Sequence, residues 1–299
     1  MDITTVLTYL KDLLATFMTL LMMMSPAFGG NGSAYTAKDP DKLITSFAVV
    51  SDIHVETNNP KVYKAYGDLL EGIKAGENVK TTVFLGDNVM NGQELENIFF
   101  YTALRAVNPS ENKLVVMGNH DIGNGEGNYD SFRESYIGYN HVLTGERYEK
   151  PYYYKVIDGC YFVCLAIEDL TVNETVISEE QLSWLEGVLD EAKAAEAPIF
   201  VFNHHPMTYV TGDNKNAIAD ILVKYDNILY FHGHIHNKLE ERSFYKDHGI
   251  PSFNLPRSTE VVDYGPGDGI VVEVYENEIL VRGRNFITGE WLEGLEYTY

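Results

Sequence analysis

The sequence predicts an α/β protein built as a four-layer α/β/β/α sandwich, with two mixed β-sheets face to face and helices on their outer faces. Apolar strand segments alternate with amphipathic helical segments over residues 44–117. That order implies parallel strands joined by right-handed crossovers. A hairpin pattern, further strand–helix pairs and a β-rich end follow over residues 152–284. The 299 residues are enough for one large domain.

The first half of this domain is expected to be a strand–helix–strand–helix–strand unit. Pro60 is suited to the first turn of a helix, because its missing N–H needs no partner there. Val62, Tyr66 and Leu69 then recur at the spacing of one buried helical face. The predicted elements are strands over residues 44–51, 81–85 and 114–117, and helices over residues 61–75 and 94–107.

The second half begins with a hairpin and ends in strands. Residues 152–157 and 161–167 flank Asp158–Gly159, a strong hairpin signal. Ser178 and Gln181 have the spacing of a capping box, which predicts a helix to about residue 196. The further predicted elements are a helix over 216–224 and strands over 199–202, 227–231, 251–255, 269–275 and 279–284. Residues 123–150, rich in Gly, Asn and Tyr, predict a loop insert over the site.

The start of the chain has the pattern of a secretory signal peptide. Residues 13–24 are an apolar run, which Ser25–Pro26 ends before small residues that a signal peptidase accepts. We therefore expect a signal peptide over residues 1–29, a flexible lead-in over 30–42 and one domain over 43–299, β-rich from residue 250. Because the leading segment is acidic rather than basic, a membrane anchor or a cytoplasmic amphipathic helix remain alternatives. The signal peptide implies a secreted or cell-envelope protein, and the last alternative a cytoplasmic one.

Charge and cysteine content restrict the partners. The 44 acidic and 22 basic residues give a net charge of −22, which argues against nucleic acid as a partner because nucleic acids attract basic surfaces. A small anionic substrate is compatible with this charge if bound cations reverse the local field. Cys160 and Cys164 lie about 13 Å apart on an extended strand, too far for a disulfide, so we expect two buried thiols. The sequence leaves the oligomeric state open.

Five polar motifs follow the predicted strands. In open α/β sheets, ligand-binding groups collect just beyond the carboxyl ends of strands. Alternation along an extended chain also predicts that Asp52 and His54 lie on one side of the backbone. The motifs are Asp52–Ile53–His54, Gly86–Asp87–Asn88, Gly118–Asn119–His120–Asp121, Asn203–His204–His205–Pro206 and Gly233–His234–Ile235–His236.

The motifs supply seven candidate metal ligands and no thiolate. Mixed nitrogen and oxygen donors suit Mn, Fe, Zn or Mg rather than a structural tetrathiolate zinc site. Seven ligands are too many for one ion, but they suit two ions about 3.5–4 Å apart that share a carboxylate. The candidates are Asp52, His54, Asp87, Asn119, His204, His234 and His236.

The order of these motifs resembles the calcineurin-like metallophosphoesterase family over about residues 46–240. The resemblance implies that the first ion is held by Asp52, His54 and His236, the second by Asn119, His204 and His234, and both by Asp87. It implies a hydroxide between two divalent or trivalent ions as the nucleophile that attacks phosphorus. His120 would stabilise the transition state or protonate the leaving group, and Asp121 would orient the His120 ring.

The sequence differs from two branches of this family at positions that matter for the metal and the substrate, which restricts the expected activity. Met90 stands where purple acid phosphatases of this superfamily have a tyrosine ligand, so we do not expect a tyrosinate-bound ferric ion. Met117, Asn88 and Val89 stand near positions where the serine/threonine phosphatases carry arginine, which argues against that branch. The His-x-Pro spacing selects His204 as the ligand, and alternation along the strand is expected to turn His205 away.

The function expected from these features is metal-dependent hydrolysis of a small phosphate ester outside the cytoplasm. Whether the substrate is a monoester or a diester is open, and Arg133, Arg147 and Arg257 are candidates for a phosphate clamp. Asn88 and Asn91 are further candidates for phosphate contact. The alternative function is that of a metal-binding cell-envelope interaction protein without catalytic turnover. The acidic charge opposes a third idea, a nuclease.

Overall fold

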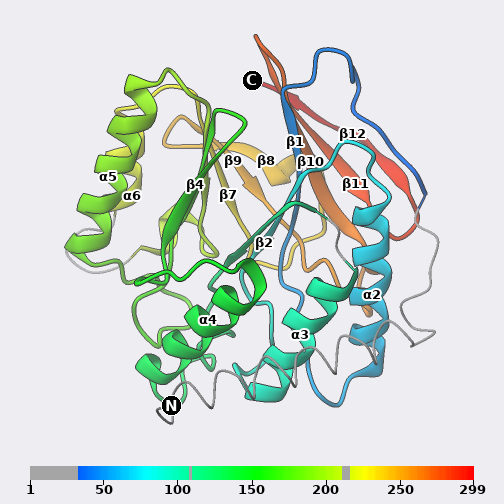
Figure 1. Ribbon diagram of the computed structural model, residues 1–299, viewed down its shortest axis with the longest axis vertical. Coiled ribbons are helices and arrows are strands. Elements are labelled where there is room, and N and C mark those ends of the chain that lie inside the picture. The colour runs from blue at the N-terminus through cyan, green and yellow to red at the C-terminus, as the bar shows by residue number, and fades with distance from the viewer. Residues whose placement is uncertain (1–32, 108–109, 211–215) are drawn as a thin grey trace.

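The computed structural model describes residues 33–107, 110–210 and 216–299. The predicted signal peptide lies outside these residues. Two six-stranded sheets form the centre of the fold, in the strand orders β12-β11-β10-β1-β2-β3 and β4-β5-β6-β7-β9-β8. Figure 1 shows helices α5 and α6 beyond one sheet and helix α2 beside the other. The predicted α/β fold of two mixed sheets flanked by helices is therefore confirmed.

The first sheet joins a parallel unit to an antiparallel one. Its parallel strands are β1 (Thr45–Val50), β2 (Thr81–Leu85) and β3 (Asn112–Val116). The end of the chain adds β10 (Asp268–Val274), β11 (Ile279–Asn285) and β12 (Glu290–Thr298), with β10 antiparallel to β1. The β12 strand was not predicted, because six of its nine residues are exposed and only one is buried. The carboxyl ends of β1, β2 and β3 lie at one edge of this sheet.

The second sheet has the same mixed character. The hairpin of β4 (Tyr153–Ile157) and β5 (Cys160–Cys164) leads into the parallel strands β6 (Ile199–Phe202) and β7 (Ile228–His232). The strands β8 (Phe244–Asp247) and β9 (Ile250–Asn254) complete it, and β9 pairs with β7 in parallel. Cys160 and Cys164 are buried free thiols, as expected.

Three apolar cores hold the layers together. Phe47, Phe162, Phe200 and Phe231 meet in the core between the two sheets. Outside the first sheet, Phe84 packs among the residues of α2 (Pro60–Lys74), α3 (Glu94–Val107) and α4 (Tyr129–Thr144). Outside the second sheet lie α5 (Glu179–Ala194) and α6 (Ala217–Leu222). Burial of these apolar surfaces is the main source of stability.

The predicted loop insert over residues 123–150 is wrong, because α4 occupies its centre. Asn128 caps the helix by accepting a hydrogen bond from Ser131, and Gly145 ends it in the left-handed conformation. Tyr136 and Tyr139 are buried, and the Tyr136 hydroxyl donates to the Val115 carbonyl at 2.5 Å. These tyrosines therefore pack the helix onto the first sheet.

Part of the predicted lead-in, residues 30–42, also packs on the domain. The backbone N–H of Tyr35 donates to the Ala75 carbonyl, and the Tyr35 ring lies against the Arg284 guanidinium and the Trp291 ring. The N–H of Lys38 donates to Glu273 on β10.

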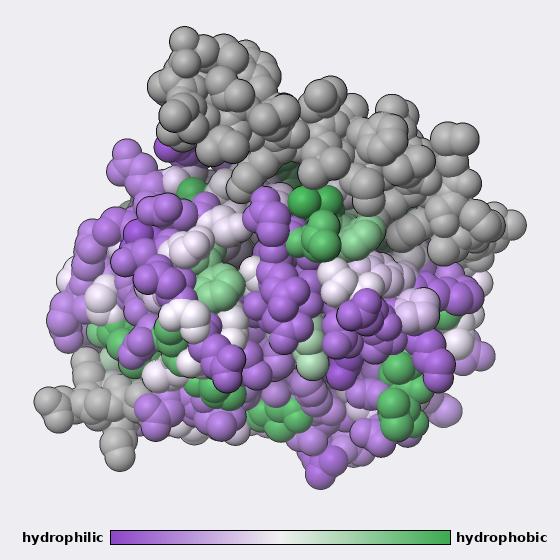
Figure 2. Space-filling model, turned by 90° about the horizontal axis from the view of Figure 1, so that it is seen from below, coloured by the Kyte–Doolittle hydropathy of each residue, from purple (hydrophilic) through white to green (hydrophobic). Residues whose placement is uncertain are grey.

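Among the described residues, no helix combines the length and the apolar character that a membrane span requires. Figure 2 shows a face that is mostly hydrophilic, with small separate hydrophobic groups.

Candidate metal centre

All five polar motifs lie just beyond the carboxyl ends of parallel strands. The first three motifs follow β1, β2 and β3 of the first sheet, and the last two follow β6 and β7 of the second. Because the carboxyl ends of parallel strands lie at the same edge of a sheet, the motifs of both sheets lie in one region. The structure thus brings the seven candidate ligands together.

The backbone turns sharply at most of the candidate ligands. Five of the seven have a left-handed conformation, with φ between 48° and 71°: Asp52, His54, Asp87, His234 and His236. A non-glycine residue in such a conformation costs on the order of 1–3 kcal/mol, and such strain gathers at functional sites. The expected alternation along an extended strand is therefore the wrong reason for the convergence of Asp52 and His54. Their side chains do converge, with His54 Nε2 3.6 Å from Asp52 Oδ1, but through turns.

Two motif glycines make room for the ligands. A Cβ atom on Gly118 would lie 2.3 Å from both the N and the Oδ1 of Asp87. A Cβ atom on Gly233 would lie 2.4 Å from Asp52 Oδ2 and 2.1 Å from Ser51 Oγ. Only glycine fits at these two positions without displacing a carboxylate.

The first ligand cluster contains Asp52, His54, Asp87 and His236. Their candidate ligand atoms all lie within 4.8 Å of one another. His236 Nε2 lies 2.9 Å from Asp52 Oδ1 and 3.0 Å from His54 Nε2. The His236 side chain is 36% exposed, so this cluster is reached from the surface at His236.

The second cluster lies on the other side of Asp87. His204 Nε2 is 3.1 Å from Asp87 Oδ2, which is itself 3.8 Å from His54 Nε2 of the first cluster. Asn119 Oδ1 lies 3.1 Å from His234 Nδ1. Asp87 thus lies between the clusters, which is the position that a shared ligand requires.

The donor atoms fit a pair of cations. His204 Nδ1 is 2.9 Å from the Leu85 carbonyl, which can only accept, so this nitrogen carries a proton and Nε2 faces the ligands. His204 Nε2 is buried and, although Asp87 Oδ2 lies 3.1 Å away, no hydrogen bond of good geometry joins this nitrogen to any described residue. Buried polar atoms are normally satisfied, and a cation between His204 and Asp87 would satisfy this one.

Charges in the centre shift the pKa values of its groups. Burial raises the pKa of Asp52 and Asp87, but the charge of His204 together with the hydrogen bonds and charges of the neighbouring histidines outweighs burial and holds both pKa values well below their usual range. Burial lowers the pKa of His204, but the two carboxylates raise it to about 9. Burial lowers the pKa of His54 and His234 to about 4. Without a cation, a proton on His204 therefore offsets the carboxylates.

His120 lies beside the first cluster, with its ring partly exposed. Its Nδ1 is 2.6 Å from the Met90 carbonyl, so Nδ1 carries a proton and Nε2 faces Asp87 Oδ2 at 4.0 Å. The ring packs edge-on against His54, with centroids 4.6 Å apart. The side chain is 17% exposed, so Nε2 is available for proton transfer.

The expected role of Asp121 is wrong. Asp121 makes no hydrogen bond to the His120 ring, which is oriented by the Met90 carbonyl. Asp121 Oδ1 instead accepts from the N–H groups of Asn88 and Val89, and Oδ2 accepts from the Gly118 N–H and the Asn88 side chain. Burial and the Asp87 charge raise the pKa of Asp121 to about 7. Asp121 therefore holds two ligand-bearing loops together.

Asn88 and Asn91 are also structural. Asn88 Nδ2 donates to the Val116 carbonyl and to Asp121, while the Asn91 side chain donates to Glu96.

The expectation for His205 is wrong as well, because its ring faces the centre. His205 Nε2 lies 3.2 Å from Asn119 Oδ1, and the His205 and His234 rings are 4.2 Å apart. His232 bonds to Tyr245 away from the ligands, as expected of a packed histidine.

The residues that support the first loop could not be identified from the sequence. Ser258 exchanges two hydrogen bonds with the backbone of Ser51, and the Thr259 hydroxyl donates to the Ile53 carbonyl at 2.6 Å. Burial lowers the pKa of His236, and the charge of Arg257, just before them, lowers it further, but Asp52 and Asp87 outweigh both and raise it. These contacts join residues about 200 positions apart, which no local pattern reveals.

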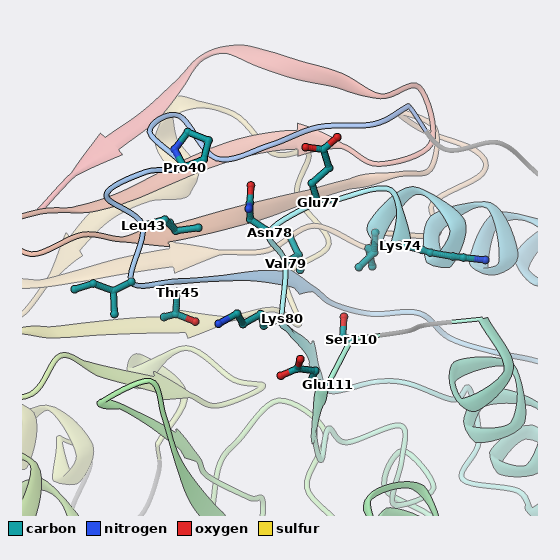
Figure 3. Close-up of a pocket in the computed structure, with 13 residues that line it drawn as sticks. Pro40, Leu43, Thr45, Lys74, Glu77, Asn78, Val79, Lys80, Ser110 and Glu111 are labelled. Carbon is teal, nitrogen blue, oxygen red and sulfur yellow. The ribbon is translucent and has the colours of Figure 1, made fainter.

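A separate cavity of about 400 Å³ lies at the amino ends of β1 and β2, the opposite edge from the ligands (Figure 3). Its wall carries Lys74 and Lys80 but also Glu77 and Glu111. Because these charges balance, the cavity has no preference for an anion. It is not part of the metal centre.

The fold and the two candidate ligand clusters indicate the class of calcineurin-like phosphoesterases. The family model described as calcineurin-like phosphoesterase matches residues 45–238, and the chain belongs to this family. No curated protein matches the chain in sequence.

Several solved structures are similar to the chain. A dimetal phosphatase from Danio rerio has a TM-score of 0.58 at 14% identity, covering 86% of this chain and 98% of its own. Wild-type Vps29 with zinc from Entamoeba histolytica has a TM-score of 0.37 at 15% identity, covering 85% and 98%. A predicted phosphoesterase from Streptococcus pneumoniae has a TM-score of 0.39 at 14% identity, covering 85% and 97%. The first of these likenesses shows a shared fold.

Cation binding is expected to release a proton from His204. Its raised pKa, about 9, keeps the metal-free ring protonated at pH 7, whereas a ligand needs its lone pair. The apparent affinity for Zn²⁺ should therefore rise with pH up to about 9 and then level off. Calorimetric titrations in buffers of different ionisation enthalpy measure this release. Affinity that is independent of pH, with no proton released, would contradict the assignment.

Proposed function

We propose that the chain hydrolyses a phosphate ester of a small molecule at a dinuclear metal centre. The observation that carries the proposal is the gathering of the six other candidate donors and His120 around Asp87. Cations bound there, of identity Mn, Fe, Zn or Mg, supply Lewis-acid chemistry: they lower the pKa of water and balance charge on phosphoryl oxygens.

The residues of the chain have separate tasks in this reaction. Asp87 joins the two clusters and fixes their separation. The N–H of His120 donates to Asp87 Oδ1 at 2.8 Å, so the same residue that carries the acid–base ring also positions the shared carboxylate. The ring, held at Nδ1 by Met90, moves a proton at Nε2, to the leaving oxygen of the substrate.

Substitution of His120 is expected to separate chemistry from metal binding. His120→Ala should lower kcat on 4-nitrophenyl phosphate by about 10²- to 10⁴-fold and leave the metal content unchanged. Asp87→Ala should lose both the activity and the bound metal, because the shared ligand is removed. His248→Ala, at an exposed turn histidine, serves as the control. Activity of His120→Ala and Asp87→Ala equal to that of the parent would sink the proposal.

Arg257 is proposed to contact a phosphoryl oxygen. Its backbone N–H donates to the Tyr264 hydroxyl, which in turn donates to the His236 carbonyl at 3.3 Å. Its guanidinium Nε is buried and has no hydrogen-bond partner among the described residues. These bonds fix the Arg257 backbone beside the exposed side of the first cluster. The positive charge of the Arg257 guanidinium then complements the additional negative charge that a phosphate monoester carries.

Arg257→Gln should raise KM more than it lowers kcat, because a charge-assisted hydrogen bond is lost. The expected increase is about 10- to 100-fold on 4-nitrophenyl phosphate, from roughly 1.5–3 kcal/mol, and smaller on the bis ester. Steady-state kinetics on both substrates also decide between monoester and diester preference. Arg242→Gln, on an exposed arginine that pairs with Glu240, is the control. Equal KM values for parent and Arg257→Gln would exclude the contact.

Secretion or location in the cell envelope is a further proposal, and it rests on the sequence of residues 1–29 alone. The expected product is a chain that starts after about residue 29. N-terminal sequencing of the exported protein checks this, and a chain retained in the cytoplasm with Met1 in place would refute it.

A further inference from the structure

His205 is an imidazole in the metal centre to which the ligand set assigns no role. It is fully buried. Its Nδ1 lies 2.7 Å from the Thr175 hydroxyl, so its Nε2 is the nitrogen that faces the second cluster. There it lies 3.2 Å from Asn119 Oδ1, which the family pattern makes a metal ligand.

The distances between the donor atoms allow His205 to share one coordination shell with the other donors of the second cluster. The candidate ligand nitrogens of His204, His205 and His234 all lie within 4.8 Å of one another. Asn119 Oδ1 lies 3.2 Å from the nitrogen of His205 and 3.1 Å from that of His234. Two ligands at right angles on one ion, with bonds of about 2.1 Å, lie about 3.0 Å apart. The observed separations match that value.

The surroundings of His205 fix its ring in this direction. Its carbonyl accepts from the Tyr230 hydroxyl at 2.8 Å and from Asn203 Nδ2 at 3.0 Å. Thr175, which holds Nδ1, is buried, and its N–H donates to the Tyr209 carbonyl at 2.7 Å. A ring that only filled space would need no such anchors, whereas a ligating imidazole typically has its second nitrogen held by a polar group.

We propose that His205 Nε2 is a fifth protein donor of the second cation site, beside Asp87, Asn119, His204 and His234. The inference rests on the proposed dinuclear function and deepens it. The second site then has three imidazoles, whereas the first has two imidazoles and two carboxylates. Because imidazole favours Zn²⁺ over Mg²⁺, the two sites select different ions, and the second has the stronger preference for zinc.

The test compares His205→Gln with His232→Gln, the same substitution at an equally buried histidine that bonds to Tyr245 instead. Each protein is loaded with two equivalents of Zn²⁺. Competition with a chelator should show that His205→Gln binds one of the two ions about 10- to 100-fold more weakly and the other unchanged. X-ray absorption at the zinc edge should count five histidine rings over two ions in the parent and in His232→Gln, and four in His205→Gln.

The ring count distinguishes a ligand from a residue that only positions Asn119. A parent with two zinc ions and four bound rings overturns the inference, even if His205→Gln binds zinc more weakly, and leaves the proposed function standing. A parent that binds no zinc overturns both. If His205→Gln fails to fold, as judged by circular dichroism, the count on the parent alone decides.

Discussion

The Asp87 carboxylate is the contact on which the rest of the centre depends. One of its oxygens accepts from the His120 N–H, and the other faces His204 of one cluster and His54 of the other. Its backbone carbonyl accepts from the His54 N–H, so the loops after β1 and β2 are joined to each other. A displacement of Asp87 would therefore disturb the candidate ligands of both clusters and His120, the proposed acid–base residue, at once.

This arrangement explains the strain in the ligand loops. Left-handed conformations at five ligands are unfavourable, and the dense hydrogen bonds of Asp121, Ser258 and Thr259 hold the loops in place. Two facing sheets with a core of phenylalanine rings provide the rigid base. The free energy of apolar burial thereby stabilises a fold that keeps the carboxylates and imidazoles close together before any cation binds.

Local patterns in the sequence predicted most of the fold and the residues that the structure gathers at the candidate metal centre. Strand–helix alternation and turn residues are local signals, so β1 to β3, α2, α3 and the hairpin of β4 and β5 were predicted near their observed bounds. The helix α4 was missed although its signals were present: Asn128 and Gly145 cap it, and Tyr129, Tyr136 and Tyr139 have helical spacing. The roles of Asp121 and His205 were mistaken because they depend on contacts between distant loops and on where each strand ends.

The measurement that tests the account most directly is a crystal structure of the protein with Mn²⁺, with anomalous diffraction to locate the ions. The account predicts two anomalous peaks about 3.5–4 Å apart, one on each side of Asp87 and with that carboxylate touching both. A single peak, or two peaks of which only one contacts Asp87, would contradict it.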